Sequence, residues 1–267
     1  MARNTNLLRR MLAPILVFDL DGTLADTAPD LLASLRAVLT RYGFKADPDP
    51  ALRDGIGHGA RHLIEYALRQ QQVSPGTGTV DAMHRDFLAY YEENICAETQ
   101  AYPGVDRLLD RFADCGWKFA VCTNKPESYS RLLLDQLGLL PRFAAICGGD
   151  TFATRKPHPA HLFGTILAGG GVPDGAVMVG DSRTDLDTAR AAGIPFIGVS
   201  FGYTPVPMAE LGPDILLDSY DELTVCAAQE LVSGSERAAA MTIVPAGPLD
   251  FADPRTYSFG IPVGQGA

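Results

Sequence analysis

Short apolar segments that end abruptly in polar residues recur along this chain. The first of them, residues 15–18, has four apolar residues, two of them β-branched, and runs directly into Asp19-Leu20-Asp21-Gly22-Thr23. This pattern is typical of a strand that is buried on both faces of a sheet and leads into a polar loop. The later segments of the same kind are 119–122, 144–147, 176–179, 196–199 and 215–217.

Stretches with helical periodicity separate these apolar segments. They cover residues 105–115, 127–137, 160–168 and 184–192. Strands that alternate with helices of about ten residues indicate right-handed crossovers and a parallel sheet covered on both faces. We therefore predict an α/β fold with a Rossmann-like, doubly wound parallel sheet. In such folds the functional site lies at the carboxyl ends of the strands.

The spacing of the polar clusters reveals an insertion. Asp19 and Thr123 lie 104 residues apart, whereas a strand–helix–strand unit needs only about 30 residues. The surplus of about 70 residues contains three helix-like stretches, 31–42, 60–70 and 80–93. We expect a small α-helical cap domain of residues 29–101, inserted after the first strand and placed to cover the site.

The remaining boundaries follow from this insertion and from the composition of the C-terminal segment. We expect the core domain to comprise residues 14–28 and 102–232. Residues 234–267 contain five Gly and four Pro and no long apolar periodicity. This composition lies near the low-complexity range and predicts a flexible tail over residues 233–267.

Asp19 and Asp21 follow the first strand with one residue between them. Side chains at positions i and i+2 of an extended strand end point the same way, so both carboxylates can enter one pocket while Leu20 turns into the core. Gly22 permits a tight turn, and Thr23 can cap the segment that follows. An ordinary turn rich in Asp and Gly is the alternative, but matching polar clusters after three later strands favour a functional site.

A second acidic pair, Asp181 and Asp185, follows the strand-like segment 176–179. Four residues apart at a helix start, the two side chains lie on one face. Asp185 could instead be an acid favoured by the helix dipole. With Asp19 and Asp21, this pair would place four carboxylates at neighbouring strand ends, where they repel one another unless a divalent cation lies among them. An all-oxygen set with room for water and phosphate suits Mg²⁺.

Thr123, Asn124 and Lys156 supply complementary hydrogen-bond donors at the other strand ends. Lys156 precedes Pro157-His158-Pro159, and the prolines on both sides of His158 fix the loop that carries the lysine. These groups together are the parts of a site for phosphoryl transfer: a carboxylate nucleophile, a cation, a lysine and a hydroxyl for the phosphate oxygens, and a second carboxyl as proton donor.

The charge balance narrows the possible partners. Lys and Arg number 22 against 32 Asp and Glu, which gives a net charge of −10 and repels nucleic acid and anionic lipid. We expect a small anionic phosphorylated metabolite as partner, and neither nucleic acid nor a membrane. The five cysteines include no CxxC pair, and no apolar run reaches the roughly 18 residues of a membrane span, which favours a cytoplasmic protein. Monomer and homodimer both remain open.

The motifs, taken in order, resemble those of the haloacid dehalogenase superfamily, in particular its phosphatases with a helical cap between the first two core motifs. The resemblance covers residues 14–232, and its motifs stand here as Asp19-Leu20-Asp21-Gly22-Thr23, Thr123-Asn124, Lys156-Pro157, and Gly180-Asp181 with Asp185. It implies that Asp19 attacks phosphorus to form an aspartyl phosphate. It also implies that Asp21 protonates the leaving alcohol and then activates the hydrolytic water.

The same resemblance implies which residues hold the ligands. It assigns Mg²⁺ to the acidic residues of the first and last motifs, namely Asp19, the carbonyl of Asp21, Asp181 and, in support, Asp185. It assigns the phosphate to the donors of the two middle motifs, namely Thr123, Asn124 and Lys156. The implied activity is that of a magnesium-dependent phosphomonoester hydrolase.

Within the superfamily, residues 19–31, DLDGTLADTAPDL, most resemble the phosphoglycolate phosphatases. This implies hydrolysis of 2-phosphoglycolate to glycolate and phosphate. The stretch 55–61 resembles the glycine-containing cap loop of that group, and its Gly57, His58 and Arg61 are candidate contacts for the substrate carboxylate. Related enzymes that act on pyrophosphate, sugar phosphates or amino-sugar phosphates share much of this pattern.

Three other interpretations fit the residues less well. Dehalogenases of the superfamily lack an acid two positions after the nucleophile, where this chain has Asp21. A β-phosphoglucomutase relative carries a histidine twelve positions after the nucleophile, where this chain has Leu31. A phospho-receiver module also combines Asp, Thr and Lys at strand ends without turnover as its purpose, but it is shorter and has no helical insertion.

Overall fold

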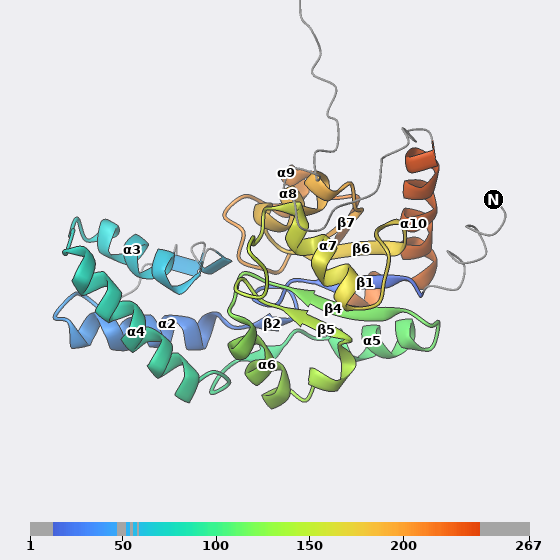
Figure 1. Ribbon diagram of the computed structural model, residues 1–267. Helices are drawn as coiled ribbons and strands as arrows, with labels where there is room; N and C mark the ends of the chain where they lie inside the picture. Colours follow the sequence, from blue (N-terminus) through green and yellow to red (C-terminus); the bar gives the residue numbers. More distant parts are fainter. Residues whose placement is uncertain (1–12, 47–51, 54–55, 58, 241–267) are drawn as a thin grey trace, which may run out of the picture.

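The computed structural model describes residues 13–46, 52–53, 56–57 and 59–240 (Figure 1). Its centre is a six-stranded sheet in the order β5-β4-β1-β6-β7-β8, in which every pairing is parallel. The strands are β1 (Ile15–Phe18), β4 (Lys118–Cys122), β5 (Ala145–Cys147), β6 (Ala176–Gly180), β7 (Phe196–Val199) and β8 (Ile215–Leu217). The predicted parallel α/β sheet is therefore confirmed.

Strand β1 is the point from which the sheet winds in both directions, because β4 lies on one side of it and β6 on the other. Its four side chains are fully buried and face two separate apolar clusters. Leu16 and Phe18 belong to one cluster, and Ile15 and Val17 belong to the other. Burial on both faces explains why this strand is continuously apolar and does not alternate apolar with polar residues.

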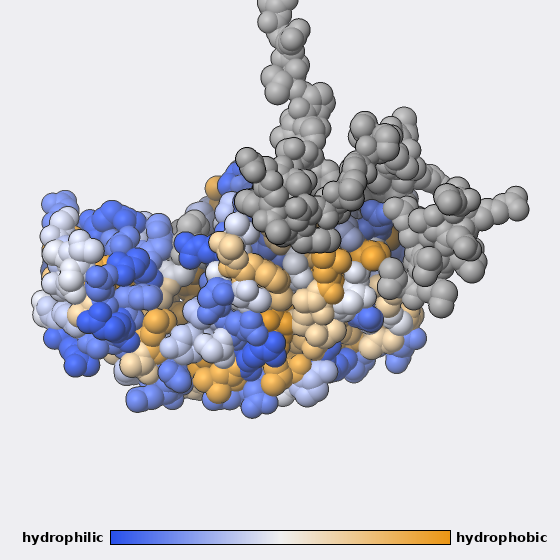
Figure 2. Space-filling model, in the orientation of Figure 1, coloured by the Kyte–Doolittle hydropathy of each residue, from blue (hydrophilic) through white to orange (hydrophobic). Residues whose placement is uncertain are grey.

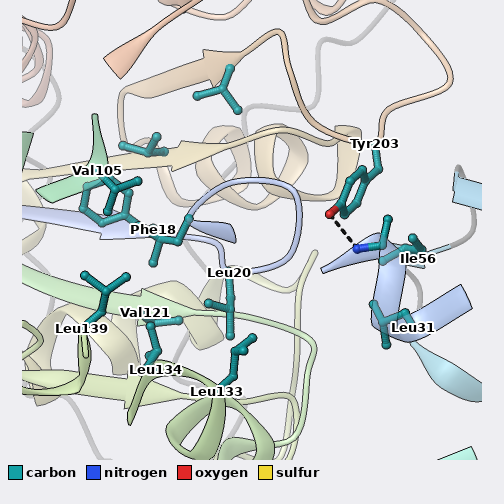
Figure 3. Packing of buried hydrophobic residues seen from close by; sticks show 14 of the residues in the cluster. Phe18, Leu20, Leu31, Ile56, Val105, Val121, Leu133, Leu134, Leu139 and Tyr203 are labelled. Carbon is teal, nitrogen blue, oxygen red and sulfur yellow. Dashed lines mark hydrogen bonds between the residues drawn. The ribbon is translucent and has the colours of Figure 1, made fainter. Parts of the chain in front are cut away.

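Helices cover both faces of the sheet (Figure 1). The helices α7 (Pro159–Ala168), α8 (Arg183–Ala192) and α9 (Met208–Leu211) supply residues to the cluster that contains Ile15. The helices α5 (Val105–Ala113), α6 (Glu127–Gln136) and α10 (Val225–Ala240) supply residues to the cluster that contains Phe18. Figure 3 shows Leu133 and Leu134 of α6 near Val121 of β4 on this second face.

Between β1 and β4 the chain forms three more helices beyond the carboxyl edge of the sheet, at the left of Figure 1. They are α2 (Ala28–Arg41), α3 (Ala60–Gln70) and α4 (Thr77–Glu93), and we call residues 28–93 the helical insertion. Each corresponds to one helix-like stretch of the sequence. The face of the insertion drawn in Figure 2 is mostly hydrophilic.

The apolar side of the helical insertion is continuous with the core beneath the sheet. Leu20, Leu31 and Ile56 connect the two and belong to the same buried cluster as Phe18 (Figure 3). Because a closely packed protein core resists displacement of its side chains, this shared cluster fixes the insertion against the carboxyl edge of the sheet.

The chain enters and leaves the helical insertion through a two-stranded antiparallel pair, β2 (Ala25–Asp26) and β3 (Gln100–Ala101), which the sequence did not predict. Beside this pair, the buried carboxylate of Asp30 accepts hydrogen bonds from the backbone N–H groups of Glu98 and Thr99, at 3.0 and 2.9 Å, and from the Thr99 hydroxyl at 2.7 Å. These bonds tie the outgoing and returning segments together.

The sequence did not predict the C-terminal helix. Helix α10 extends to Ala240, so the chain is helical past residue 232, where we expected the tail to begin. The rest of that expected tail, residues 241–267, lies outside the described residues. Within the described part of the chain, none of the helices combines the length and apolarity that crossing a membrane requires.

Candidate active site

The polar residues singled out in the sequence converge at the carboxyl edge of the sheet. Asp19 follows β1, Thr123 follows β4, and Asp181 follows β6. Lys156 lies on the loop between β5 and α7, and Asp185 lies in the first turn of α8. All five residues are buried. The parallel arrangement of the strands therefore brings together groups that are up to 166 residues apart in the sequence.

Asp19, Asp181 and Asp185 form a compact carboxylate cluster. Each offers one carboxylate oxygen, and these three oxygens all lie within 4.8 Å of one another. The hydroxyl of Thr23 donates to Asp181 Oδ1 at 3.0 Å, and the backbone N–H of Tyr203 donates to Asp181 Oδ2 at 2.7 Å. These bonds hold one member of the cluster from two sides.

Asp185 is fixed by the start of its own helix. Ser182 is the N-cap of α8, and its backbone N–H donates to Asp185 Oδ2 at 3.1 Å while its hydroxyl also donates to that oxygen. This capping box satisfies donors at the helix start. The other carboxylate oxygen, Oδ1, is left to face Lys156. Asp185 is therefore both a capping residue and a member of the cluster.

Lys156 links two of the three carboxylates. Its Nζ lies 2.9 Å from Asp19 Oδ1 and 2.6 Å from Asp185 Oδ1, and the side chain is buried. Its backbone is fixed as well, because its N–H donates to Nδ1 of the buried His161 at 3.2 Å and its carbonyl accepts from Asn124 Nδ2 at 3.1 Å. The lysine is therefore held rigidly, as the flanking prolines indicated.

Burial and crowding shift the protonation of this cluster. The pKa of Asp19 is raised to about 6, chiefly by burial, although Lys156 opposes the shift. The pKa of Asp181 is raised well above its usual range, first by burial and then by the nearby carboxylates of Asp185 and Asp19. Burial alone would lower the pKa of the Lys156 ammonium, but Asp185 and Asp19 outweigh it and raise that pKa.

The donor set fits a divalent cation. Three carboxylates and one ammonium leave two negative charges in a buried site, which are unfavourable without compensation. Oxygen ligands are those that Mg²⁺ prefers. Asp19, Asp181 and Asp185 could therefore hold this ion, and the backbone carbonyl of Asp21 follows on the same loop.

Asp21 has a partner that the sequence did not single out. Its Oδ1 lies 2.9 Å from Nζ of Lys125, which is buried on the loop after β4. Burial alone would lower the pKa of Lys125, but Asp21 and Tyr91 raise it, so the side chain is an ammonium. Lys125 stands two positions after Thr123. The i, i+2 rule that paired Asp19 with Asp21 would have indicated it.

A pocket of about 60 Å³ lies between the sheet edge and the helical insertion. On the sheet side it is lined by polar residues, which are Asp19, Asp21, Thr123, Asn124 and Lys125. On the side of the insertion it is lined mainly by apolar and aromatic residues, among them Leu31, Ile56, Phe87, Leu88 and Tyr91. The polar groups therefore face a space that apolar side chains close.

The structure separates the three candidate contacts of the insertion. Gly57 lines the pocket. Arg61 does not, because its guanidinium pairs with Asp81 and with Glu65, at 3.8 Å from the latter, in a different groove between α3 and α4. His58 lies outside the described residues. The position of Arg61 depends on how α3 packs, which a local pattern does not specify.

Tyr203 is a further residue that the sequence did not indicate. Its backbone N–H donates to Asp181, and its hydroxyl donates to Asp26 Oδ1 at 2.6 Å. The hydroxyl also accepts from the backbone N–H of Ala28 at 3.0 Å, the bond drawn in Figure 3. It therefore connects the carboxylate cluster with the start of the helical insertion. A contact made through a backbone N–H leaves no signature in the type of residue.

Comparison with known proteins gives consistent matches. A family model described as haloacid dehalogenase-like hydrolase matches residues 16–199. The chain is 47% identical over 222 residues to a phosphoglycolate phosphatase from Mesorhizobium japonicum, covering 83% of this chain and 98% of that protein. It is 42% identical over 230 residues to a phosphoglycolate phosphatase from Agrobacterium fabrum, covering 86% and 99%. A solved structure of a predicted phosphoglycolate phosphatase from Haemophilus somnus matches with a TM-score of 0.73 and 30% identity, covering 78% of this chain and 95% of that chain.

Proposed function

The chain belongs to the haloacid dehalogenase-like hydrolase family, and we propose that it is a magnesium-dependent phosphatase that converts 2-phosphoglycolate to glycolate and phosphate. The observation that carries the proposal is the carboxylate cluster of Asp19, Asp181 and Asp185 with Lys156 bonded to two of its members. The names of the relatives from Mesorhizobium japonicum and Agrobacterium fabrum support the choice of substrate.

Asp19 acts as the nucleophile in this proposal. Its Oδ1 accepts hydrogen bonds from Leu20 N at 2.7 Å and from Lys156 Nζ at 2.9 Å. Because Oδ1 is engaged twice, attack on phosphorus falls to Oδ2. The bond from Oδ2 to phosphorus forms as the bond from phosphorus to the ester oxygen breaks, which leaves an aspartyl phosphate.

Asp21 acts as the acid and then as the base. It lines the same pocket as Asp19 and retains partial exposure to that space. Asp21 gives its proton to the ester oxygen as glycolate leaves. It then takes a proton from the water that attacks the aspartyl phosphate, so that inorganic phosphate is released and the Asp19 carboxylate is restored.

Thr123 and Lys156 orient the phosphate. The Thr123 oxygen accepts a hydrogen bond from the backbone N–H of Lys125 at 3.2 Å, which leaves its hydroxyl proton free to be donated to a phosphate oxygen. The Lys156 ammonium carries a third proton beyond the two that face Asp19 and Asp185. Asn124 contributes by holding the Lys156 carbonyl. Donors fixed before substrate arrives stabilise the charge that develops on the transferred group.

The proposed metal ligands are Asp19, the carbonyl of Asp21 and Asp181, with Asp185 in support. When bound, Mg²⁺ would supply positive charge beside the transferred phosphate. The rest of the polar machinery belongs to residues 14–28 and 102–232, which we propose as the core domain. We propose that residues 29–101 form the cap domain, which closes the pocket with apolar side chains and excludes water.

We place the enzyme in the cytoplasm. Its five cysteines, Cys96, Cys115, Cys122, Cys147 and Cys226, are all free thiols, which fits a reducing compartment. The buried carboxylates and the net charge of −10 support a small phosphorylated metabolite as partner rather than nucleic acid or an anionic membrane.

The substrate is tested by measuring phosphate release with Mg²⁺ from 2-phosphoglycolate, glucose phosphates, glucosamine phosphate and pyrophosphate. The Asp19→Asn protein serves as the blank. We expect kcat/KM to be highest for 2-phosphoglycolate. A higher value for one of the other compounds would keep the phosphatase chemistry and reject the substrate, whereas no release from any compound would reject the phosphatase function.

A further inference from the structure

The pocket offers a substrate carboxylate one suitable cation among the described residues. Of the residues that line it, Lys125 is the basic one. Lys156 is not among the lining residues and is bonded to two carboxylates. Arg61 pairs with Asp81 and Glu65 in another groove. A second anionic group on the substrate, enclosed by apolar side chains, requires a positive partner.

We infer that Lys125 binds the carboxylate of the substrate and thereby selects phosphate esters that carry an acid group next to the ester carbon. This inference rests on the proposed function and deepens it. It assigns to a core loop the specificity that the sequence pattern assigned to the cap residue Arg61.

The position of Lys125 matches the covalent geometry of such an ester. Asp21, the proposed proton donor, must come within about 2.6–3.2 Å of the ester oxygen. In 2-phosphoglycolate a single CH₂ group separates that oxygen from the carboxyl carbon, so the carboxylate oxygens lie within about 3–4 Å of the ester oxygen. Because Lys125 Nζ is 2.9 Å from Asp21 Oδ1, it lies next to the place where this carboxylate would be.

Tyr91 of α4 completes the subsite from the opposite side of the pocket. Lys125 Nζ lies 4.5 Å from the centroid of its ring, a cation–π contact that orients the ammonium. The Tyr91 hydroxyl is buried and makes no hydrogen bond of good geometry within the described part of the chain, although it interacts with the neighbouring Lys125 ammonium. Burial raises the pKa of Tyr91 to about 12, so the hydroxyl remains a donor at neutral pH.

Two donors are therefore available for one carboxylate. The ammonium of Lys125 can donate three hydrogen bonds, and Asp21 accepts one of them. The buried hydroxyl of Tyr91 otherwise leaves a polar group unsatisfied, which is unfavourable. Phe87 and Tyr129 flank Tyr91, with ring centroids at 6.2 and 6.1 Å. This aromatic wall keeps the subsite dry, so that the charge of Lys125 is weakly screened.

The experiment compares two esters that differ only in the acid group. Values of kcat/KM with Mg²⁺ are measured for 2-phosphoglycolate and for ethyl phosphate, which has the same length but no carboxylate, with wild-type enzyme and the Lys125→Met variant. We expect Lys125→Met to lower kcat/KM for 2-phosphoglycolate at least about 100-fold, mainly through KM, and that for ethyl phosphate less than tenfold. The preference for 2-phosphoglycolate should therefore collapse.

Three matched variants sharpen the comparison. Arg61→Met removes the rival cation, and Lys118→Met removes an exposed lysine whose Nζ donates to the Gly170 carbonyl. Both should keep the wild-type preference. Lys125→Arg keeps the charge and should retain most of the preference for 2-phosphoglycolate. If Lys125→Met does not fold, Lys125→Arg is used as the test.

The outcomes distinguish the inference from the function on which it rests. Several results would overturn the assignment of Lys125 and leave the proposed function intact. In a folded Lys125→Met protein, these are a preference like that of the wild type or an equal loss of kcat/KM on both esters. In Lys125→Arg or Arg61→Met, it is the loss of the preference for 2-phosphoglycolate. A wild-type enzyme with no preference for 2-phosphoglycolate over ethyl phosphate would overturn the proposed function and this inference with it.

Discussion

The two sides of the pocket are built in opposite ways. On the sheet edge, charged groups are buried and each is held by several partners, as Lys156 is by Asp19 and Asp185. On the helical insertion, the groups that face the pocket are mainly apolar and aromatic, with the Tyr91 hydroxyl as a polar exception, and charged residues such as Arg61 and Asp81 pair with one another on the exterior. The difference indicates that the sheet edge performs the chemistry, whereas the insertion supplies shape and excludes water.

This difference also explains the expected sizes of mutational effects. A buried charge that loses its partner is strongly destabilised, so changes on the sheet edge should be severe. An exposed ion pair contributes little to stability because water and salt screen it. Changes to charged residues of the insertion should therefore be mild.

The largest effect is expected for Lys156→Met. The variant leaves the buried carboxylates of Asp19 and Asp185 without their ammonium, and breaking such a pair costs about 3–5 kcal/mol. It also removes a donor to the transferred phosphate, which costs about 10²–10³ in kcat. Urea unfolding and phosphate release measure the two effects. Lys118→Met, at an exposed lysine, is the control. Equal losses of stability and of kcat in the two variants would contradict the expected difference between buried and exposed charges.

The second-largest effect is expected on the stability of the metal-free protein when the pH changes. Burial raises the pKa of Asp19 from 3.8 to about 6. A carboxyl whose pKa is raised on folding stabilises the fold while protonated, so this contribution is present below the unfolded value and is lost as pH rises through 6. The rise of the pKa from 3.8 to about 6 corresponds to roughly 3 kcal/mol of unfolding free energy.

Urea unfolding in chelator between pH 4.5 and 7.5 measures this dependence. The free energy of unfolding of the wild type should fall as pH rises, and that of Asp19→Asn should fall less steeply. Addition of Mg²⁺ should flatten the wild-type dependence, because a bound cation stabilises the ionised cluster. If the free energy of unfolding depended on pH with the same slope in both proteins, burial would not raise the pKa of Asp19.

The third-largest effect is expected on KM, for variants of Tyr91, where the insertion contacts Lys125 of the sheet edge. Tyr91→Phe removes the hydroxyl and keeps the ring, and it should raise KM for 2-phosphoglycolate about fivefold, equivalent to the roughly 1 kcal/mol of one hydrogen bond. Tyr91→Leu also removes the cation–π contact with Lys125 and should raise KM about 30-fold. Steady-state kinetics with ethyl phosphate as second substrate check both values, and an equal rise for both esters would point to general disruption of the pocket.

The smallest effect is expected for Arg61→Met. The Arg61 side chain is 44% exposed and pairs with Glu65 and Asp81, whose side chains are 40% and 43% exposed. We expect kcat/KM for 2-phosphoglycolate to change less than about twofold and the free energy of unfolding to stay close to that of the wild type. A tenfold loss of kcat/KM would indicate that Arg61 contacts the substrate, and it would contradict the division of roles between the sheet edge and the insertion.

The sequence predicted the sheet edge well because strand geometry is local. A buried strand such as β1 is readable as an apolar run, and the parallel order then brings Asp19, Asp181 and Lys156 to one edge without further information. Lys125 lies in the same run as Thr123 and follows from the same i, i+2 rule. That rule gives only the direction of its side chain, whereas its ion pair with Asp21 depends on the neighbouring loop.

The helical insertion was predictable in its helices but not in its contacts. The stretches 60–70 and 80–93 have helical periodicity, and α3 and α4 form there. Which side of α3 meets the pocket depends on packing among buried residues of several helices, and this placed Arg61 outside it. The contact of the Tyr203 backbone N–H with Asp181 had no side-chain signature. The two-residue strands β2 and β3 were too short to show a period.

The central claim is that the carboxylate of Asp19 carries the phosphoryl group. The most direct test is to mix the enzyme and Mg²⁺ with 2-phosphoglycolate labelled in its phosphate, quench with acid and locate the label by digestion and mass spectrometry. We predict label on Asp19 of the wild type and none on the Asp19→Asn protein, which should be folded and have lost turnover. Label on another residue, or turnover retained by Asp19→Asn, would contradict the account.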